Sequence, residues 1–274
     1  MRDLRMGLRD LPVRGPAVRD LALALPPDRM APMRAGRPLK RWRYVGVYRR
    51  DLMLCVGDAR VAGVPQRWWA LALPDGTLVE GSRGVEMSPG RAVVRGVLEL
   101  QLDEGEGEGV EIVSPHGRSY IWTRKQAPVH VRGRVSAAGR TWELDGANGF
   151  VDESAGYHAR RTAWRWSAGV GRTDDGRRVA WNLVDGVHDA PSSSERTVWV
   201  EGEPREVPRQ EFAGGLSAVG ALSFREWSAR ESRMNLVLMR NSYRQPFGEF
   251  NGELPCGLRL AEGYGVMEVH DVRW

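Results

Sequence analysis

Residues 152–189 contain the densest group of side chains in this sequence that could carry out acid–base chemistry. Asp152, Tyr157, His158 and Asp185 lie there among several tryptophans. Histidine titrates near neutral pH, and burial among apolar groups raises the pKa of a carboxyl toward the same range. We therefore expect Asp152, Tyr157 and His158 to exchange protons with a substrate, with Asp185 as a further catalytic candidate.

Other side chains in this segment and near the C-terminus are suited to holding a ligand. Successive residues of a strand point to opposite faces, so Trp164 and Trp166 share one face, as do Glu268 and His270. Tryptophan faces can line an apolar pocket or stabilise a developing positive charge. The candidate ligand-binding residues are Arg160, Arg161, Trp164, Trp166, Trp181, Asn182, Glu268 and His270.

Each candidate also has a structural interpretation. Asp185 precedes Gly186 in a turn dipeptide, His188 begins a short run that ends in Pro191, and Asp152 suits the end of a loop. The tryptophans would equally fill the core of a β-barrel. A structural role and a functional role therefore remain open for every one of these residues.

The sequence lacks the motifs of the common cofactor and hydrolase classes. It has no Gly-x-Ser-x-Gly elbow, phosphate-binding loop, His-Glu-x-x-His motif, cysteine pair with zinc spacing or dinucleotide fingerprint. We expect no cofactor and no metal. The acidic run from Asp103 to Glu111 suits a solvated hairpin loop, with calcium binding as a weaker alternative because regular ligand spacing is absent.

Strand patterns dominate the rest of the chain. From Trp42 onward polar and apolar residues alternate, and Asp75-Gly76, Asp175-Gly176 and Asn251-Gly252 are hairpin dipeptides between such runs. We predict an all-β protein with little helix. Residues 1–38 are rich in proline and arginine, which predicts an extended N-terminal arm that adds little to the strand ladders.

A weak internal similarity suggests two β units. Residues 42–47 resemble residues 164–170, and each stretch is followed by a strand that runs into an Asp-Gly turn, at 75–76 and 185–186. A duplication and a coincidence between tryptophan-rich strands both fit this pattern. We predict a first barrel domain over residues 39–140 and a second over residues 141–274.

Composition narrows the function classes. The net charge of +5 is uneven, because residues 1–50 carry +9 and the remainder carries −4, which argues against nucleic-acid binding. Since no apolar run is long enough to span a bilayer and no export signal is evident, we expect a cytoplasmic protein without a transmembrane segment. Cys55 and Cys256 are predicted to be reduced packing residues. The oligomeric state is not indicated.

Three motifs carry a resemblance to a known family. They are Lys40-Arg41-Trp42-Arg43-Tyr44, residues 156–166 beginning Gly-Tyr-His, and residues 246–252 reading Pro-Phe-Gly-Glu-Phe-Asn-Gly. Over about residues 36–274 the chain resembles the bacterial domain of unknown function 2804 family. It is more distantly similar to the lipocalin-like double-barrel group of carotenoid hydratases, kievitone hydratase, AttH-type proteins and Diels-Alderases. Ala159, Arg160 and Arg161 stand where the hydratases have an Asp-His pair.

The resemblance implies two packed lipocalin-like antiparallel barrels that bind a lipophilic small molecule, isoprenoid-like or polyketide-like. As an enzyme, such a protein would catalyse cofactor-free hydration, cyclisation or isomerisation. A non-catalytic binder or carrier would need the same pocket without an acid. A third possibility is a scaffold that uses its basic arm to hold a partner or an anionic surface. Such a protein would have filled barrels and no cavity.

Overall fold

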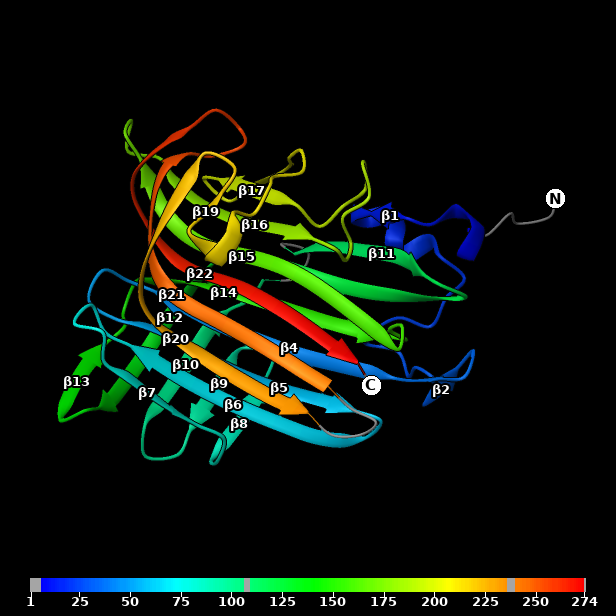
Figure 1. Cartoon of the computed structure of the whole chain (residues 1–274), viewed down its shortest axis with the longest axis horizontal. Helices are drawn as coiled ribbons and strands as arrows, with labels where there is room; N and C mark the ends of the chain where they lie inside the picture. Colours follow the sequence, from blue (N-terminus) through cyan, green and yellow to red (C-terminus); the bar gives the residue numbers. More distant parts are fainter. Residues whose placement is uncertain (1–5, 106–108, 236–239, 274) are drawn as a thin grey trace.

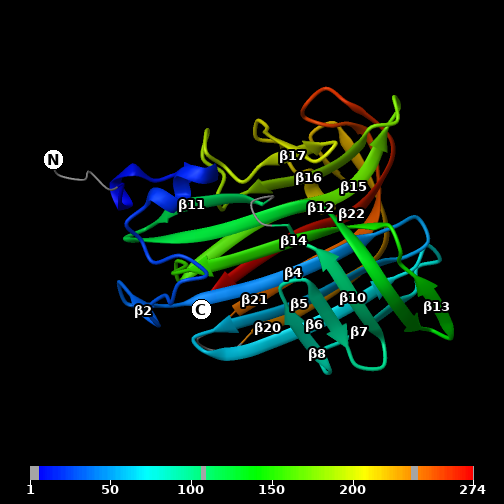
Figure 2. The ribbon, with the colours of Figure 1, turned by 180° about the vertical axis from the view of Figure 1, so that it is seen from behind.

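The computed structural model describes residues 6–105, 109–235 and 240–273 and is built almost entirely of antiparallel strands. Two large sheets lie against each other, as Figures 1 and 2 show from opposite sides. The only helical elements in the described part of the chain are the 3₁₀ turns η1 (Leu8–Asp10), η2 (Gly15–Asp20) and η3 (Gly214–Leu216). None of its helices could cross a bilayer.

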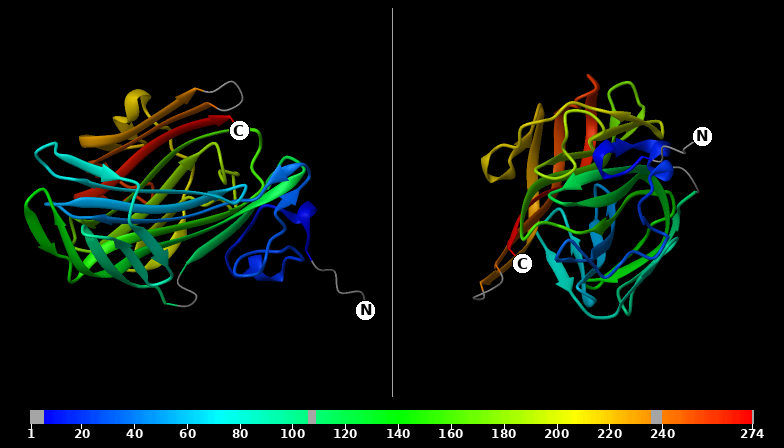
Figure 3. Two further views of the ribbon diagram at one scale, coloured as in Figure 1. Left: turned by 90° about the horizontal axis from the view of Figure 1, so that it is seen from below. Right: turned by 90° about the vertical axis from the view of Figure 1, so that its right-hand side faces the viewer.

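The first sheet has 12 strands, in the order β7-β6-β5-β4-β14-β12-β10-β9-β8, with β11, β13 and β1 attached through β12 and β11. It curls into a half-barrel, best seen end on in Figure 3. Its strands are β1 (Val13–Arg14), β4 (Lys40–Tyr48), β5 (Met53–Val61), β6 (Val64–Ala72), β7 (Leu78–Gly81), β8 (Val85–Ser88), β9 (Arg91–Val94), β10 (Leu98–Asp103), β11 (Val110–His116), β12 (Ser119–Ala137), β13 (Arg140–Glu143) and β14 (Ala147–Gly156).

The second sheet has eight strands, in the order β18-β17-β16-β15-β22-β21-β20-β19. It also curls into a half-barrel. Its strands are β15 (Arg161–Thr173), β16 (Arg178–Asp185), β17 (Thr197–Val200), β18 (Glu203–Glu206), β19 (Ala218–Val219), β20 (Leu222–Asn235), β21 (Arg240–Glu253) and β22 (Arg259–Arg273). A short hairpin, β2 (Met33–Arg34) and β3 (Arg37–Pro38), precedes the first sheet. The predicted all-β fold of two packed antiparallel units is confirmed.

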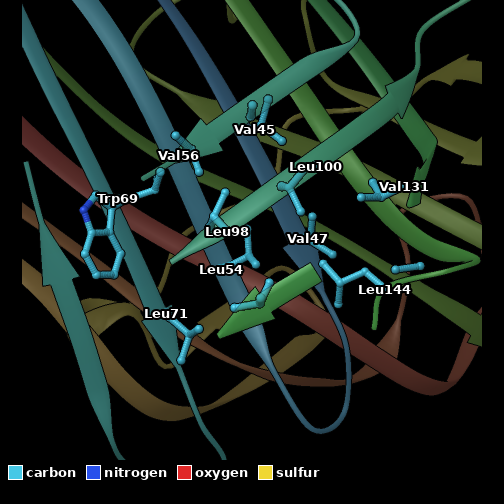
Figure 4. Packing of buried hydrophobic residues seen from close by; sticks show 14 of the residues in the cluster. Val45, Val47, Leu54, Val56, Trp69, Leu71, Leu98, Leu100, Val131 and Leu144 are labelled. Carbon is cyan, nitrogen blue, oxygen red and sulfur yellow. The ribbon is translucent and has the colours of Figure 1, made fainter. Parts of the chain in front are cut away.

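Alternation along the strands produces separate apolar layers. On β4, Val45 and Val47 point into the hollow of the first sheet, where they join Leu54, Leu100 and other aliphatic side chains (Figure 4). Tyr44 and Tyr48 point the other way and pack against the second sheet. The second sheet has its own core around Trp181 and Phe250. Each half-barrel is therefore filled by side chains, and a third layer joins the two sheets.

The change from one sheet to the other lies between Gly156 and Arg161. Strand β14 pairs with β4 and β12, and its Val151 belongs to the core of the first sheet. The predicted first domain, residues 39–140, is therefore shorter than the first sheet. Strand β14, which lies between β4 and β12 in this sheet, comes after residue 140 in the sequence. The two similar Asp-Gly strands also differ in position, since β6 is the second strand after β4 whereas β16 directly follows β15.

The N-terminal arm is folded rather than extended over its described residues. Strand β1 pairs with β11, as Val13 with Val113, and Arg14 donates to the hydroxyl of Thr197 on the second sheet over 2.9 Å. Val18 is fully buried in a small core that also contains Trp122. The arm adds only the two residues of β1 to the hydrogen-bond ladders of the first sheet, as its prolines suggest. It nevertheless covers one end of that sheet. Residues 1–5 of the predicted arm lie outside the described residues.

Truncating a side chain inside the first half-barrel should weaken the fold far more than truncating one on its rim. Leu100 is fully buried, so Leu100→Ala should lower the free energy of unfolding by about 2–5 kcal/mol. Val64, which is 61% exposed at the start of β6, provides the control, and Val64→Ala should cost less than about 0.5 kcal/mol. Urea denaturation measures both. Equal losses would show that the hollow is not packed as described.

Candidate functional site

A groove of about 1720 Å³ lies between the first sheet, the N-terminal arm and the turn before β18. It continues the face of the sheet that carries the apolar core, but its walls are charged. Arg43 forms ion pairs with Glu104 and with Glu153, where Nη1 and Oε1 are 2.7 Å apart, and Arg124 also reaches Glu153. A charged wall is a poor match for a lipophilic molecule. None of the residues that we predicted for catalysis or ligand binding lines this groove.

Part of the predicted set lies instead in the layer between the two sheets, including Trp164, Trp166, Glu268 and His270. Cross-strand pairing places Trp164 beside His270 and Trp166 beside Glu268, because β15 and β22 are neighbours. Tyr243 of β21 pairs with His270 from the other side. The face of the second sheet that meets the first sheet is thus partly polar.

Glu268 is the central acid of this layer. Its Oε1 accepts a hydrogen bond from Trp164 Nε1 over 2.7 Å, and its Oε2 accepts one from Gln245 Nε2 over 2.9 Å. Burial raises the pKa of Glu268 to about 7, although the hydrogen bonds from Trp164 and Tyr243 favour the ionised form. The side chain is 8% exposed, so a carboxyl that can gain or lose a proton near neutral pH stands at the margin of the layer.

Aromatic rings surround this carboxyl. The rings of Trp164 and His270 have centroids 4.3 Å apart, and Trp164 stacks on Trp42 of the first sheet at 6.5 Å with an angle of 6° between the planes. Trp42, Trp164, Tyr243 and His270 are all partly exposed. These rings make this end of the inter-sheet layer both apolar and rich in π-electron density.

A guanidinium lies on the other side of Tyr243. Arg230 stands over the Tyr243 ring at 5.6 Å and over the Trp68 ring at 5.8 Å, and its Nε is 3.1 Å from Glu80 Oε2. The Trp68 ring itself lies across Gly57, where a Cβ would come within 2.2 Å of it. Arg230 is thereby held in place as a fixed positive charge.

Asp152, a predicted catalytic acid, belongs to a separate charge cluster in the layer, and it is 8% exposed, as Glu268 is. Lys125 Nζ is 2.5 Å from Asp152 Oδ1 and 3.4 Å from Glu195 Oε2, which belongs to the second unit. Burial lowers the pKa of Lys125, but the two carboxylates outweigh it and hold the pKa above its ordinary value. Burial raises the pKa of Glu195 to about 7. Removing one member would leave an uncompensated buried charge, so this cluster joins the two units.

The structure distributes the other predicted residues over different environments. Tyr157 donates its hydroxyl proton to the Ala31 carbonyl over 2.8 Å and so fastens the arm. Asp185 is paired with Arg209 at the surface, and Arg161 pairs with the exposed Asp271. The remaining ones are Arg160, which is exposed, Trp181, which fills the second core, Asn182, which is buried and accepts from Trp166 Nε1, and His158, which is buried beside Trp42.

Several residues of the layer were not anticipated from the sequence. Gln245 and Tyr243 lie on β21, whose register with β22 the sequence does not reveal. Arg230 lies on β20, in a stretch, residues 228–234, whose sequence also suited a short helix. One compositional signal was available for Lys125. The chain contains only two lysines, Lys40 and Lys125, and both are buried, with exposures of 2% and 4%.

Metal and thiol chemistry have few candidates in the layer. Among the described residues, no three His, Cys, Asp or Glu side chains are arranged to hold a metal ion. Cys55 is fully buried, and burial raises its pKa to about 11, so it is a protonated thiol at neutral pH. Cys55 and Cys256 form no disulfide, as the sequence predicts.

Comparison with known proteins gives one family and several distant folds. The matching family model is described as a domain of unknown function (DUF2804) and covers residues 77–213, half of the chain. No curated protein matches the chain. Similar solved structures include an AttH-like protein, described as putative, from Nitrosomonas europaea, with 12% identity, a TM-score of 0.40 and coverage of 91% of this chain and 98% of that one.

Two further solved structures show the same degree of similarity. Kievitone hydratase from Nectria haematococca is 9% identical with a TM-score of 0.43, covering 84% of this chain and 88% of its own. CghA is 12% identical with a TM-score of 0.41, covering 90% of each chain. The predicted resemblance is confirmed by these matches. Such low identities leave the activity of this chain to be argued from its own residues.

The raised pKa of Glu268 should appear in the pH dependence of stability. A carboxyl with an ordinary pKa of 4.5 and a folded-state pKa of about 7 stabilises the fold below its unfolded pKa, and this contribution is lost as pH rises through 7. Glu268→Gln cannot ionise. Its free energy of unfolding relative to wild type should therefore rise by on the order of 3 kcal/mol between pH about 5 and about 8.

Urea denaturation at several pH values measures this difference. Trp164→Phe keeps an aromatic ring but removes the N–H that favours the carboxylate, so it should move the transition to higher pH. A constant difference between wild type and Glu268→Gln would show that Glu268 titrates normally.

The hydroxyl of Tyr157 should matter for stability and not for proton transfer. Tyr157→Phe removes the hydrogen bond to the Ala31 carbonyl, which should cost about 1 kcal/mol and lower the melting temperature by roughly 2–4 °C. Differential scanning calorimetry gives the shift. A variant with unchanged melting temperature would contradict the role assigned to this contact.

Proposed function

We propose that this chain, which belongs to the DUF2804 family of unknown function, is a cofactor-independent acid–base catalyst that acts on a lipophilic small molecule at the aromatic end of the inter-sheet layer. Hydration, cyclisation and isomerisation are the reactions that fit. Glu268 exchanges the proton, and Trp42, Trp164, Trp166 and His270 contact the substrate.

The proposal rests on the state of the Glu268 carboxyl. Both of its oxygens accept hydrogen bonds, from Trp164 and Gln245, so its orientation is fixed. Its pKa is raised to about 7 by burial, so protonated and ionised forms coexist at neutral pH. A catalytic acid or base is most effective when its pKa is close to the working pH. The sequence prediction placed Glu268 among the ligand-binding residues and gave the acid–base roles to Asp152, Tyr157 and His158, with Asp185 as a further candidate.

Asp152 is less suited to proton exchange because it forms a buried ion pair with the ammonium group of Lys125. One of its oxygens faces Lys125 and the other accepts a long hydrogen bond of 3.3 Å from Trp42 Nε1. We assign Asp152 the role of positioning Trp42, whose ring stacks on Trp164. His158 also contacts the Trp42 ring, with centroids 5.2 Å apart.

The reaction can be written with the side chains present. The protonated Glu268 carboxyl gives its proton to an alkene carbon or to a carbonyl oxygen of the substrate and becomes a carboxylate. The positive charge that develops faces the rings of Trp42 and Trp164, which stabilise it through their quadrupoles. Loss of a neighbouring proton to the carboxylate gives an isomer, whereas addition of water followed by the same proton transfer gives a hydrated product.

A non-catalytic binder remains the second candidate because of the donors around Glu268. Trp164 and Gln245 donate hydrogen bonds to Glu268, and both contacts favour its ionised form. A carboxylate that stays ionised can bind a ligand without transferring a proton to it. The two functions differ in one respect. Removing the ionisable group abolishes turnover in a catalyst, whereas in a binder it changes affinity alone.

The substrate should be recoverable from the protein. Organic extracts of the purified chain, analysed by mass spectrometry, should contain a lipophilic compound, which then serves in turnover assays. Glu268→Gln should reduce kcat by about 10²–10⁴ while changing KM little.

The matched control is Glu249→Gln, because Glu249 accepts a hydrogen bond from Trp227 Nε1 over 3.0 Å in a similar pair away from Trp164. This variant should keep kcat within a factor of about two of wild type. Full turnover in Glu268→Gln, or equal loss in both variants, would rule out Glu268 as the proton donor.

A further inference from the structure

Three histidines from distant parts of the sequence meet at the edge of the inter-sheet layer. His116 ends β11, His158 follows β14, and His188 lies in the loop after β16 of the second unit. The rings of His116 and His158 have centroids 5.7 Å apart. His188 Nδ1 lies 2.8 Å from the hydroxyl oxygen of Ser114, two residues before His116. Both units of the protein therefore contribute to one imidazole cluster.

The cluster contains an unusual number of buried polar atoms without a partner. His116 Nε2, His158 Nδ1, His188 Nε2 and the Ser119 hydroxyl have none among the described residues. His158 and His188 are more than nine-tenths buried, with exposures of 5% and 7%, and Ser119 pairs with His116 across the β11–β12 hairpin. Buried polar groups are nearly always hydrogen-bonded, so four such atoms together indicate a bound polar species.

The charges around the cluster select the sign of that species. Burial lowers the pKa of each histidine, and nearby basic groups lower it further: Arg37 and Lys40 for His116, Lys40 for His158, and Lys125 for His188. Burial also lowers the pKa of Lys40 to about 7, so Arg37 and Lys125 supply the full positive charges near the cluster at neutral pH. Lys125 itself is held by Asp152 and Glu195 on its far side. These surroundings repel a cation and attract an anion.

Two backbone features hold the histidines in place. His188 adopts a φ of +47°, a left-handed conformation that is costly for a residue with a side chain and that directs its ring toward Ser114. Arg37 Nη1 donates to the His116 carbonyl over 2.9 Å, so a guanidinium is fixed beside the most accessible of the three rings.

We propose that His116, His158 and His188, together with Arg37 and the Ser119 hydroxyl, bind an oxyanion such as a phosphate or carboxylate group. Imidazole N–H groups, the serine hydroxyl and the guanidinium are the donors. Each neutral imidazole carries one N–H, and its tautomer follows the partner that it meets. This site is distinct from Glu268, and the inference does not depend on the proposed reaction.

Binding of an anion should be coupled to proton uptake. The three histidines are neutral at pH 7 because their pKa values lie below the ordinary 6.5. A bound negative charge favours imidazolium and raises these pKa values, so affinity should increase as pH falls. Acetate, whose charge does not change over this range, should therefore bind more tightly at pH about 6 than at pH about 8.

Isothermal titration with sodium phosphate or sodium acetate, at constant ionic strength set with chloride, measures the affinity, and NMR of labelled histidine follows the rings. His116→Gln and Arg37→Met should each weaken phosphate binding at least tenfold. His130→Gln is the matched control, because His130 is an exposed histidine of the same sheet and should leave binding unchanged.

A second pair of titrations distinguishes the source of the oxyanion. Preference for phosphate or acetate identifies a free-ion site, whereas preference for a long-chain carboxylate identifies the acidic group of a larger molecule that extends over Trp42, and either result supports the proposal. Absence of saturable binding for all of these anions, equal binding in His116→Gln and His130→Gln, or binding of zinc ion in place of anions would overturn it. Loss of Glu268-dependent turnover leaves this test unaffected.

Discussion

The structure depends on burying the outer faces of two curled sheets against each other. Each strand near the contact, such as β4, supplies one set of side chains to its own hollow and the opposite set to the layer between the sheets. A change of register by one residue would exchange the two sets and expose Val45 and Val47 where Tyr44 and Tyr48 now lie. The requirement to fill three layers at once therefore fixes the register of both sheets.

Polar groups in the middle layer make this contact specific. Two apolar faces could slide over each other, but Lys125 of the first sheet must meet Glu195 of the second unit. Asn182 holds the Glu195 segment in place by donating to the Glu195 carbonyl over 2.8 Å. Lys125 and Glu195 lose their hydration on burial, and their ion pair offsets this loss only in one relative placement of the units. The same low polarity that makes them expensive to misplace also raises the pKa of Glu268.

Sequence patterns predicted what is local and missed what depends on pairing between distant strands. Alternation correctly places Trp164 and Trp166 on one face, and Asp-Gly dipeptides correctly mark turns such as that at Gly176. Alternation cannot reveal that Trp181 points into the second core, away from the face that carries Trp164 and Trp166. The direction of Trp181 follows from its cross-strand pairing with Gly169. Lys125 and Glu195 are 70 residues apart in sequence, and neither has a local feature that indicates its partner. The arm was predicted as extended because proline prevents long elements, whereas single turns and scattered apolar residues were enough to cover Trp122.

The burial of both lysines has a consequence for covalent chemistry at the surface. All other basic side chains apart from histidine are arginines, so the folded chain presents no lysine ammonium group to solvent. Acetyl, methyl and ubiquitin groups that are transferred to lysine cannot reach Lys40 or Lys125 while both side chains stay buried. Amine-directed reagents would likewise reach Lys125 only when its contact with Glu195 of the second unit opens, so acylation of Lys125 measures how often the two half-barrels come apart.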